Sequence, residues 1–176
     1  MFGLGKKKYN VDSLVDLLMN SLLSSEAIGA ESEHLNAELS QYSDLVLDKQ
    51  RSVKKYWLLL KSQLIFGAIA KSTDVIKYEK AKSLLKEKIE LKYDLKFAEE
   101  SITEFSPFNR YILSYAKSDV NDAIASLRVD FLLNLGISEL TQNSMQTGEV
   151  GMILHRKISH HFMGSHKAII DSIKII

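Results

Sequence analysis

The chain has 176 residues, enough for one domain that buries its own core without a structural metal or disulfides. Its 23 Lys and Arg residues nearly balance its 22 Asp and Glu residues, so overall charge gives no argument for a nucleic acid or an anionic membrane as partner. The absence of cysteine excludes disulfides, Cys-ligated zinc, iron–sulfur clusters and thiol nucleophiles, and the single proline favours long helices.

The first ten residues, MFGLGKKKYN, are predicted to be a flexible basic N-terminus. The basic run follows the apolar residues, which is the wrong order for a secretory signal. Met1, Phe2 and Leu4 beside three lysines also give a weak signal for contact with an anionic membrane surface. A frayed, solubilising end is the simpler interpretation.

Two helices are expected next. Residues 12–23 form a short amphipathic helix with a capping-box-like pair, Ser13 and Asp16. From 31 to 70 the apolar residues recur at alternating spacings of four and three, broken only by Lys49. This pattern predicts one long amphipathic helix, on the order of 60 Å at about 1.5 Å per residue.

The most apolar part of that helix, residues 57–70, contains Lys61. It is also shorter than the roughly 20 residues that a membrane-spanning helix needs. We therefore expect a soluble, cytoplasmic protein. Trp57 lies one position off the apolar stripe, so it is either a core residue or an anchor of a protein interface.

The same spacing continues over residues 81–105 and predicts a second long helix. Ser72, Thr73 and Asp74 are N-cap candidates for it, which favours a short turn between antiparallel helices. The stripe is broader than the seam of a two-stranded coiled coil, so the helix needs more than one neighbour.

A third helix is predicted to begin at Ser106 as N-cap, with Pro107 as its first residue, and to end at Gly136. Its stripe slips in phase near residues 117–119. The remaining segment, residues 138–176, contains three glycines and is expected to form one helix or two.

The chain ends in AIIDSIKII, where Ile169, Ile173 and Ile176 would share one helical face. Such an apolar end docks against its own core or against a partner, so these isoleucines join Trp57 as interface candidates. The elements together predict an all-α fold: an antiparallel bundle of about four long helices plus a short N-terminal helix, in one domain covering residues 1–176.

Four of the five histidines lie in HRKISHHFMGSH, residues 155–166, at spacings of five, one and five. On a regular helix no pair among them can chelate one ion, because metal-binding pairs on helices are three or four residues apart. A di-iron-like bundle would use Glu-x-x-His twice, and the chain has this pattern only once, from Glu31 to His34. In the alternative interpretation, a metal-binding helical bundle, the ligands would be His34, Glu38, His166 and Asp171.

No phosphate-binding loop, nucleophile elbow or Ser-His-Asp set is recognisable, so an enzyme has little support and no cofactor is expected. We predict a non-enzymatic protein that acts through protein–protein interaction in assembly, as an adaptor or in regulation, and that forms a homo-oligomer. The alternative is a metal-binding helical bundle. The third reading is nucleic-acid binding through the second long helix, whose lysines are Lys77, Lys80, Lys82, Lys86, Lys88 and Lys92. The glutamates between them are more typical of a solvated, ion-paired face.

Overall fold

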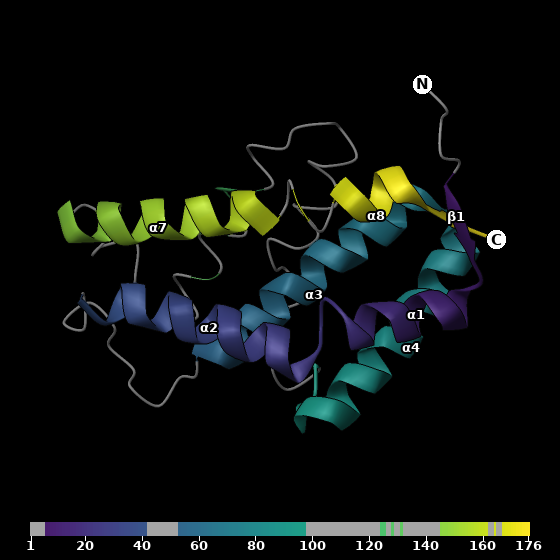
Figure 1. Ribbon diagram of the computed structural model, residues 1–176, viewed down its shortest axis with the longest axis horizontal. Coiled ribbons are helices and arrows are strands. Elements are labelled where there is room, and N and C mark those ends of the chain that lie inside the picture. The colour runs from purple at the N-terminus through teal and green to yellow at the C-terminus, as the bar shows by residue number, and fades with distance from the viewer. Residues whose placement is uncertain are drawn as a thin grey trace.

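The computed structural model describes residues 6–41, 53–97, 124–125, 128, 131, 145–161, 164 and 167–176. These residues are mostly helical, which confirms the predicted all-α class (Figure 1). The helices are α1 (Val11–Asn20), α2 (Ser25–Leu39), α3 (Val53–Ser72), α4 (Val75–Tyr93), α7 (Met145–His161) and α8 (Lys167–Ser172). Two short strands, β1 (Lys7–Tyr9) and β2 (Ile173–Ile175), complete the described elements.

The prediction of one continuous helix over residues 31–70 is wrong. Helix α2 ends at Leu39, and α3 packs back against it. Side chains capture the last carbonyl groups of α2: Ser40 Oγ donates to the carbonyl of Ala37 at 2.8 Å, and Gln41 Nε2 donates to that of Glu38 at 2.9 Å. The apolar spacing could not reveal this break, because two helices that each bury a stripe can keep the same phase by chance.

Capping side chains fix where α1 and α4 begin. The Asn10 side chain accepts a hydrogen bond from the Ser13 amide at 2.8 Å, so Asn10 is the N-cap and the capping role predicted for Ser13 is wrong. Of the three predicted N-cap candidates for α4, Asp74 takes this position, since its side chain accepts from the Lys77 amide at 3.0 Å. A short turn between α3 and α4 follows, as expected.

Helix α4 ends at Tyr93, well before the predicted end at residue 105. Asp94 adopts the left-handed conformation with φ 50°, and the Leu95 amide donates back to the Glu90 carbonyl at 3.3 Å. The Glu90 carboxylate also accepts from the Phe97 amide at 2.7 Å. This local hydrogen bonding closes the helix although its apolar spacing continues.

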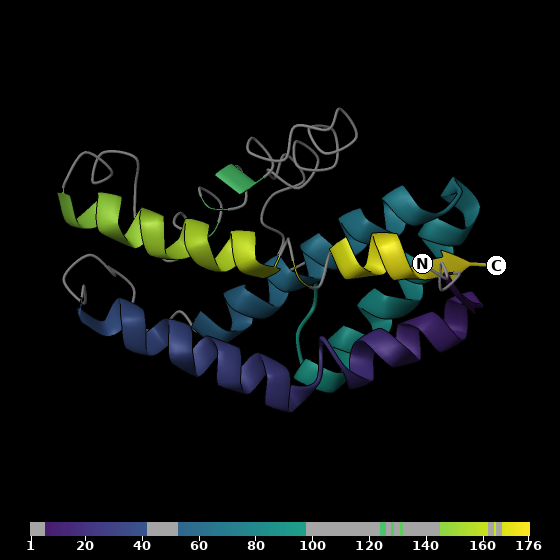
Figure 2. The same ribbon diagram turned by 45° about the horizontal axis from the view of Figure 1, so that its top comes forward.

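Most of the predicted third helix, including Ser106, Pro107 and Gly136, lies outside the described residues. Ile124 and Phe131, both on its predicted apolar stripe, are helical and buried. The C-terminal segment forms two helices, α7 and α8. Figure 2 shows α7 alongside α2 and α8 against α3.

The strands β1 and β2 join the two ends of the chain in a parallel pair. Lys7 is the register partner of Ile173, and Tyr9 that of Ile175. The Ile176 amide extends the pairing by donating to the Tyr9 carbonyl at 2.9 Å. Part of the predicted flexible N-terminus therefore lies in a strand.

The C-terminal isoleucines do not share the helical face that was predicted. Helix α8 ends at Ser172, so Ile169 is helical whereas Ile173 is in β2. The reason is the parallel pairing with β1, which draws residues 173–175 into an extended conformation.

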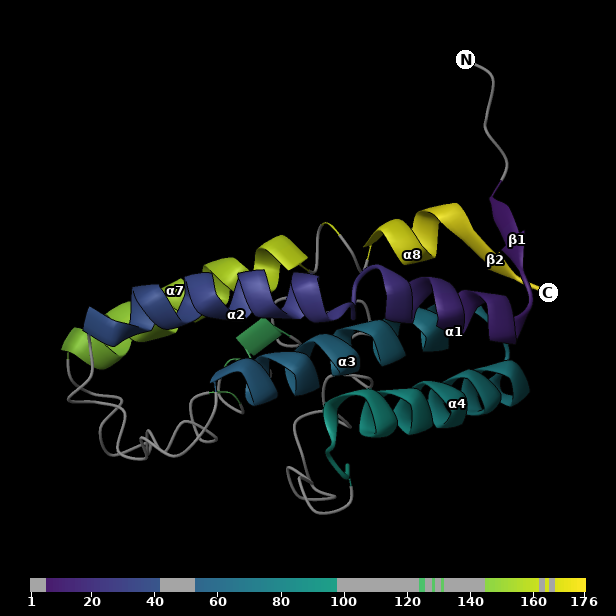
Figure 3. The ribbon, with the colours of Figure 1, turned by 60° about the horizontal axis from the view of Figure 1, so that its bottom comes forward.

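Helix α3 is the centre of the described core, in contact with α2, α4 and α8. Figure 3 shows α1 and α2 following one another along one side of α3, with α4 beside α1. From Trp57 to Ile69 nearly every α3 side chain is buried, and Lys61 and Ser62 are the polar ones among them. Among the described helices, none is long and apolar enough to cross a membrane.

Candidate functional site

A lysine lies buried in the apolar centre, where α3 faces α2. The Lys61 side chain is 2% exposed, and its Nζ donates to the two carboxylate oxygens of Glu31 at 2.7 and 2.6 Å. One turn earlier on α3, Trp57 Nε1 donates to Glu31 Oε2 at 3.0 Å. Burial lowers the pKa of the Lys61 ammonium, while the Glu31 carboxylate works in the opposite direction.

His161, the last residue of α7, contacts this buried group. Its Nε2 is 3.9 Å from Glu31 Oε2, and its ring centre is 5.0 Å from that of Trp57 in an edge-on arrangement. Burial lowers the pKa of the imidazole, and the nearby Glu31 carboxylate offsets this only in part. We call Glu31, Trp57, Lys61 and His161 the buried polar cluster.

A second carboxylate on α2, Glu38, also holds α7. It accepts from Arg156 Nη2 at 2.8 Å, and its Oε1 is 2.7 Å from Lys157 Nζ. The Lys157 hydrogen bond is the main reason why the pKa of Glu38 is lowered, although burial opposes it. His34, one turn before on the same helix, has its Nε2 3.5 Å from the carboxylate.

Of the alternative metal ligands, the three that the structure describes are not grouped into one site. His34 and Glu38 are neighbours, but the Glu38 carboxylate is engaged by the two cations of α7. Asp171 pairs with Lys167 on its own helix, and His166 lies outside the described residues. Within the part of the chain that the structure describes, no three His, Asp or Glu side chains are grouped as metal ligands.

The predicted interface residues are distributed between core and surface. Trp57 is 1% exposed and Ile169 is 3% exposed, so both pack in the core of the chain itself. Ile173 is half-buried in β2, and Ile176 is 56% exposed. Of the four, Ile176 is the one that presents a large apolar surface to solvent.

Three of the six lysines of α4 connect this helix to α1 and to the residues that follow it. Lys80 Nζ is 3.2 Å from an Asp12 carboxylate oxygen, and Lys88 Nζ is 2.8 Å from one of Asp16. Lys92 Nζ donates to the carbonyl of Met19, near the end of α1, and to that of Leu23 beyond it, each at 3.2 Å. Sequence reasoning missed these partners, because nothing in the spacing of α4 shows which helix its basic face meets.

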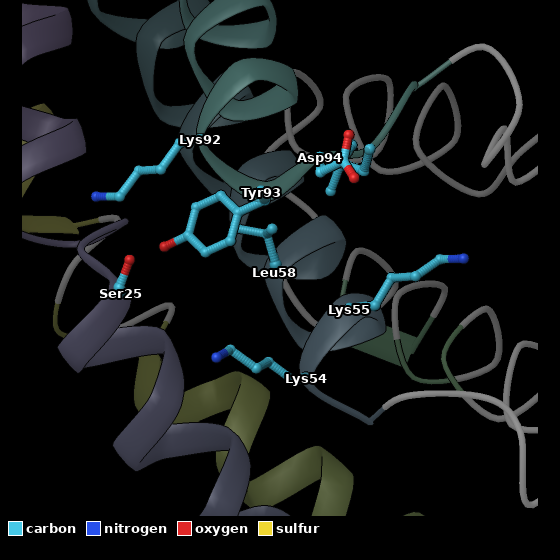
Figure 4. Close-up of a pocket in the computed structure, with 8 residues that line it drawn as sticks. Ser25, Lys54, Lys55, Leu58, Lys92, Tyr93 and Asp94 are labelled. Atoms are coloured by element: carbon cyan, nitrogen blue, oxygen red, sulfur yellow. The ribbon is translucent and has the colours of Figure 1, made fainter.

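An open pocket of about 560 Å³ lies where the N-terminal ends of α2 and α3 meet the C-terminal end of α4 (Figure 4). Its described lining is Ser25, Lys54, Lys55, Leu58, Lys92, Tyr93, Asp94 and Leu95. Three lysines thus line it against one aspartate. We call this site the lysine pocket; the sequence offered no motif for it, because its residues come from three helices.

The hydroxyls and two of the lysines gather on one side of the pocket. Figure 4 shows Lys54 and Lys92 extending toward the side where the Ser25 and Tyr93 oxygens lie, while Lys55 points away. Tyr93 Oη donates to the Leu23 carbonyl at 2.8 Å, which fixes its ring. Burial raises the pKa of the Tyr93 phenol, so this hydroxyl stays neutral at physiological pH.

No protein family, curated protein or solved structure matches this chain.

Proposed function

We propose that this protein is a non-enzymatic interaction protein, in an assembly, adaptor or regulatory role, which binds an acidic segment of a partner protein in the lysine pocket. The observation that carries this proposal is the excess of lysines over carboxylates in the lining of an open cavity, a lining that also includes Leu58 and Leu95. Ammonium groups favour a carboxylate, and the leucines favour an apolar neighbour of that carboxylate. A volume of about 560 Å³ also suits a few side chains.

The chemistry of the lining favours binding over catalysis. Its described residues include two hydroxyls, of Ser25 and Tyr93, but no histidine that would act on them as a general base. The Tyr93 hydroxyl is already committed as a donor to a main-chain carbonyl. The same lining supplies charge and apolar surface, which is what recognition of a peptide needs.

The test uses a fluorescein-labelled peptide of alternating Glu and Leu, titrated with the protein and followed by fluorescence anisotropy. We expect saturable binding that weakens as salt is added. Lys54→Glu should weaken it roughly fivefold, which corresponds to about 1 kcal/mol for one exposed charge contact. Lys54 is the better choice than Lys92, because Lys92 also holds the end of α1.

Lys174→Glu is the matched control, since it reverses the charge of an exposed lysine on β2. This variant should bind the peptide as the wild type does. Absence of saturable binding by the wild type, or equal weakening by both variants, would refute the proposal.

We also propose that the chain self-associates. Val75 and Ile76, adjacent residues in the first turn of α4, are 70% and 79% exposed. Two neighbouring large apolar side chains at this exposure give a second copy of the chain a surface to cover. An antiparallel arrangement of about four long helices remains our proposal for the whole chain.

The alternative functions have less support. A metal site would have to displace Arg156 and Lys157 from Glu38, and elemental analysis of native protein purified without chelator should find no stoichiometric metal. Nucleic-acid binding through α4 would have to draw on lysines that already pair with carboxylates, such as Lys80 and Lys88.

A further inference from the structure

Helix α7 has a buried apolar stripe, and charged side chains near its C-terminal end connect it to α2. Val150, Leu154 and Ile158, spaced four apart, are all buried. Between the last two of these residues, Arg156 and Lys157 contact Glu38, and the final residue of the helix, His161, contacts Glu31 in the buried polar cluster. Figure 2 shows the two helices side by side.

The charged groups around His161 disfavour a further positive charge on its imidazole. Four charged or titratable groups face it: Glu31 from α2, Lys61 from α3, and Lys157 and His160 from α7 itself. Glu31 is the single negative group among these four, and both of its oxygens already accept from Lys61. A protonated His161, whose side chain is 14% exposed, would therefore be a largely buried cation that Glu31 compensates only in part.

We propose that α7 is an acid-sensitive helix, which stays docked on α2 at neutral pH and loosens when His161 takes up a proton. Because burial lowers the pKa of this imidazole in the docked state, the undocked helix protonates first, near the ordinary value of 6.5. The stabilisation from the neutral imidazole is complete above that pH and is lost as the pH falls below it.

Glu38 responds at a more acidic pH. Its pKa lies below the ordinary 4.5, so its ion pairs with Arg156 and Lys157 persist while His161 titrates. They are lost only when the pH falls further. The interval between pH 7.5 and 5.5 therefore leaves the Glu38 ion pairs intact.

Hydrogen exchange followed by mass spectrometry at pH 7.5 and 5.5 tests the proposal, with rates converted to protection factors to remove the intrinsic effect of pH. Protection of α7 should fall by up to about tenfold for each pH unit below 6.5, the limit for uptake of one proton. Protection of α4 should stay unchanged. Constant protection of α7, or an equal loss in α4, would overturn the proposal.

His161→Gln should make the protection of α7 nearly independent of pH over this interval, because glutamine does not titrate. His155→Gln is the matched control: His155 is exposed on the same helix, and its variant should keep the wild-type pH dependence. If His161→Gln undocks α7 at every pH, NMR titration of the wild-type imidazole decides instead. A pKa below 6.5 supports the proposal, and one at or above 6.5 rejects it.

Discussion

At the scale of single residues, Lys61 is the point where the core departs from apolar packing. Its ammonium is tolerated because Glu31 supplies a charge and two hydrogen-bond acceptors, and Trp57 orients the same carboxylate. A buried ion pair of this kind adds little net stability over an apolar pair of the same shape, but loss of one partner is costly. Glu31 and Lys61 therefore depend on each other.

Glu31→Ala should lower the free energy of unfolding by about 3 kcal/mol, since it leaves a buried ammonium without its partner. Urea denaturation followed by circular dichroism measures this change. Glu33→Ala, at an exposed position of the same helix, should change stability by no more than about 0.5 kcal/mol. A double variant, Glu31→Gln with Lys61→Met, should recover most of the lost stability; similar losses in the single and double variants would contradict the interdependence.

The residues of the buried polar cluster were visible in the sequence, but their association was not. Lys61 counted only as a charge that interrupts an apolar stretch, and Glu31 only as part of an isolated Glu-x-x-His pattern. The two are on different helices, and their contact depends on the break after α2. Side-chain hydrogen bonds from Ser40 and Gln41 accompany the end of α2, and helical periodicity does not predict them.

At the scale of elements, the helices follow from apolar spacing and capping residues, as Asp74 at the start of α4 illustrates. The strands do not. Each has three residues, too few for an alternation of apolar and polar positions to be recognised, and each finds its partner at the opposite end of the chain. The predictions for the two ends of the chain, a flexible N-terminus and a helical C-terminus, therefore missed the strands that the structure has there.

The last residue of β2, Ile175, and the residue that follows the strand, Ile176, are a matched pair of adjacent isoleucines. Ile175 is 5% exposed and Ile176 is 56% exposed. Ile175→Ala should cost about 2 to 3 kcal/mol through lost burial and the cavity that it leaves, whereas Ile176→Ala should stay within about 0.5 kcal/mol. Thermal or urea unfolding of the two variants measures the difference, and equal effects would show that the strand does not dock as described.

At the scale of the whole molecule, α3 is the central helix and contacts α2, α4 and α8. Helix α4 exposes its outer face to solvent. The apolar side chains at the start of α4 lie away from the core. A second copy of the chain is the partner that we propose for them.

Ile76→Lys should shift the mass in sedimentation equilibrium toward that of a single chain, because a charge at the contact would have to be desolvated. Ser83→Lys, at an exposed position of the same helix, should leave the mass unchanged. A wild-type protein that sediments as a single chain at every concentration would refute self-association.

The pairing of β1 with β2 also bears on the order in which the molecule folds. Helices form from neighbours in sequence, but this small parallel sheet requires the two distant ends of the chain to meet. Closing so large a loop costs conformational entropy, and contacts formed earlier in the helical core must offset this cost. The sheet should therefore form after the helical core. A fluorescent pair placed at the two ends would then report the last step of folding, later than the gain of helical circular dichroism.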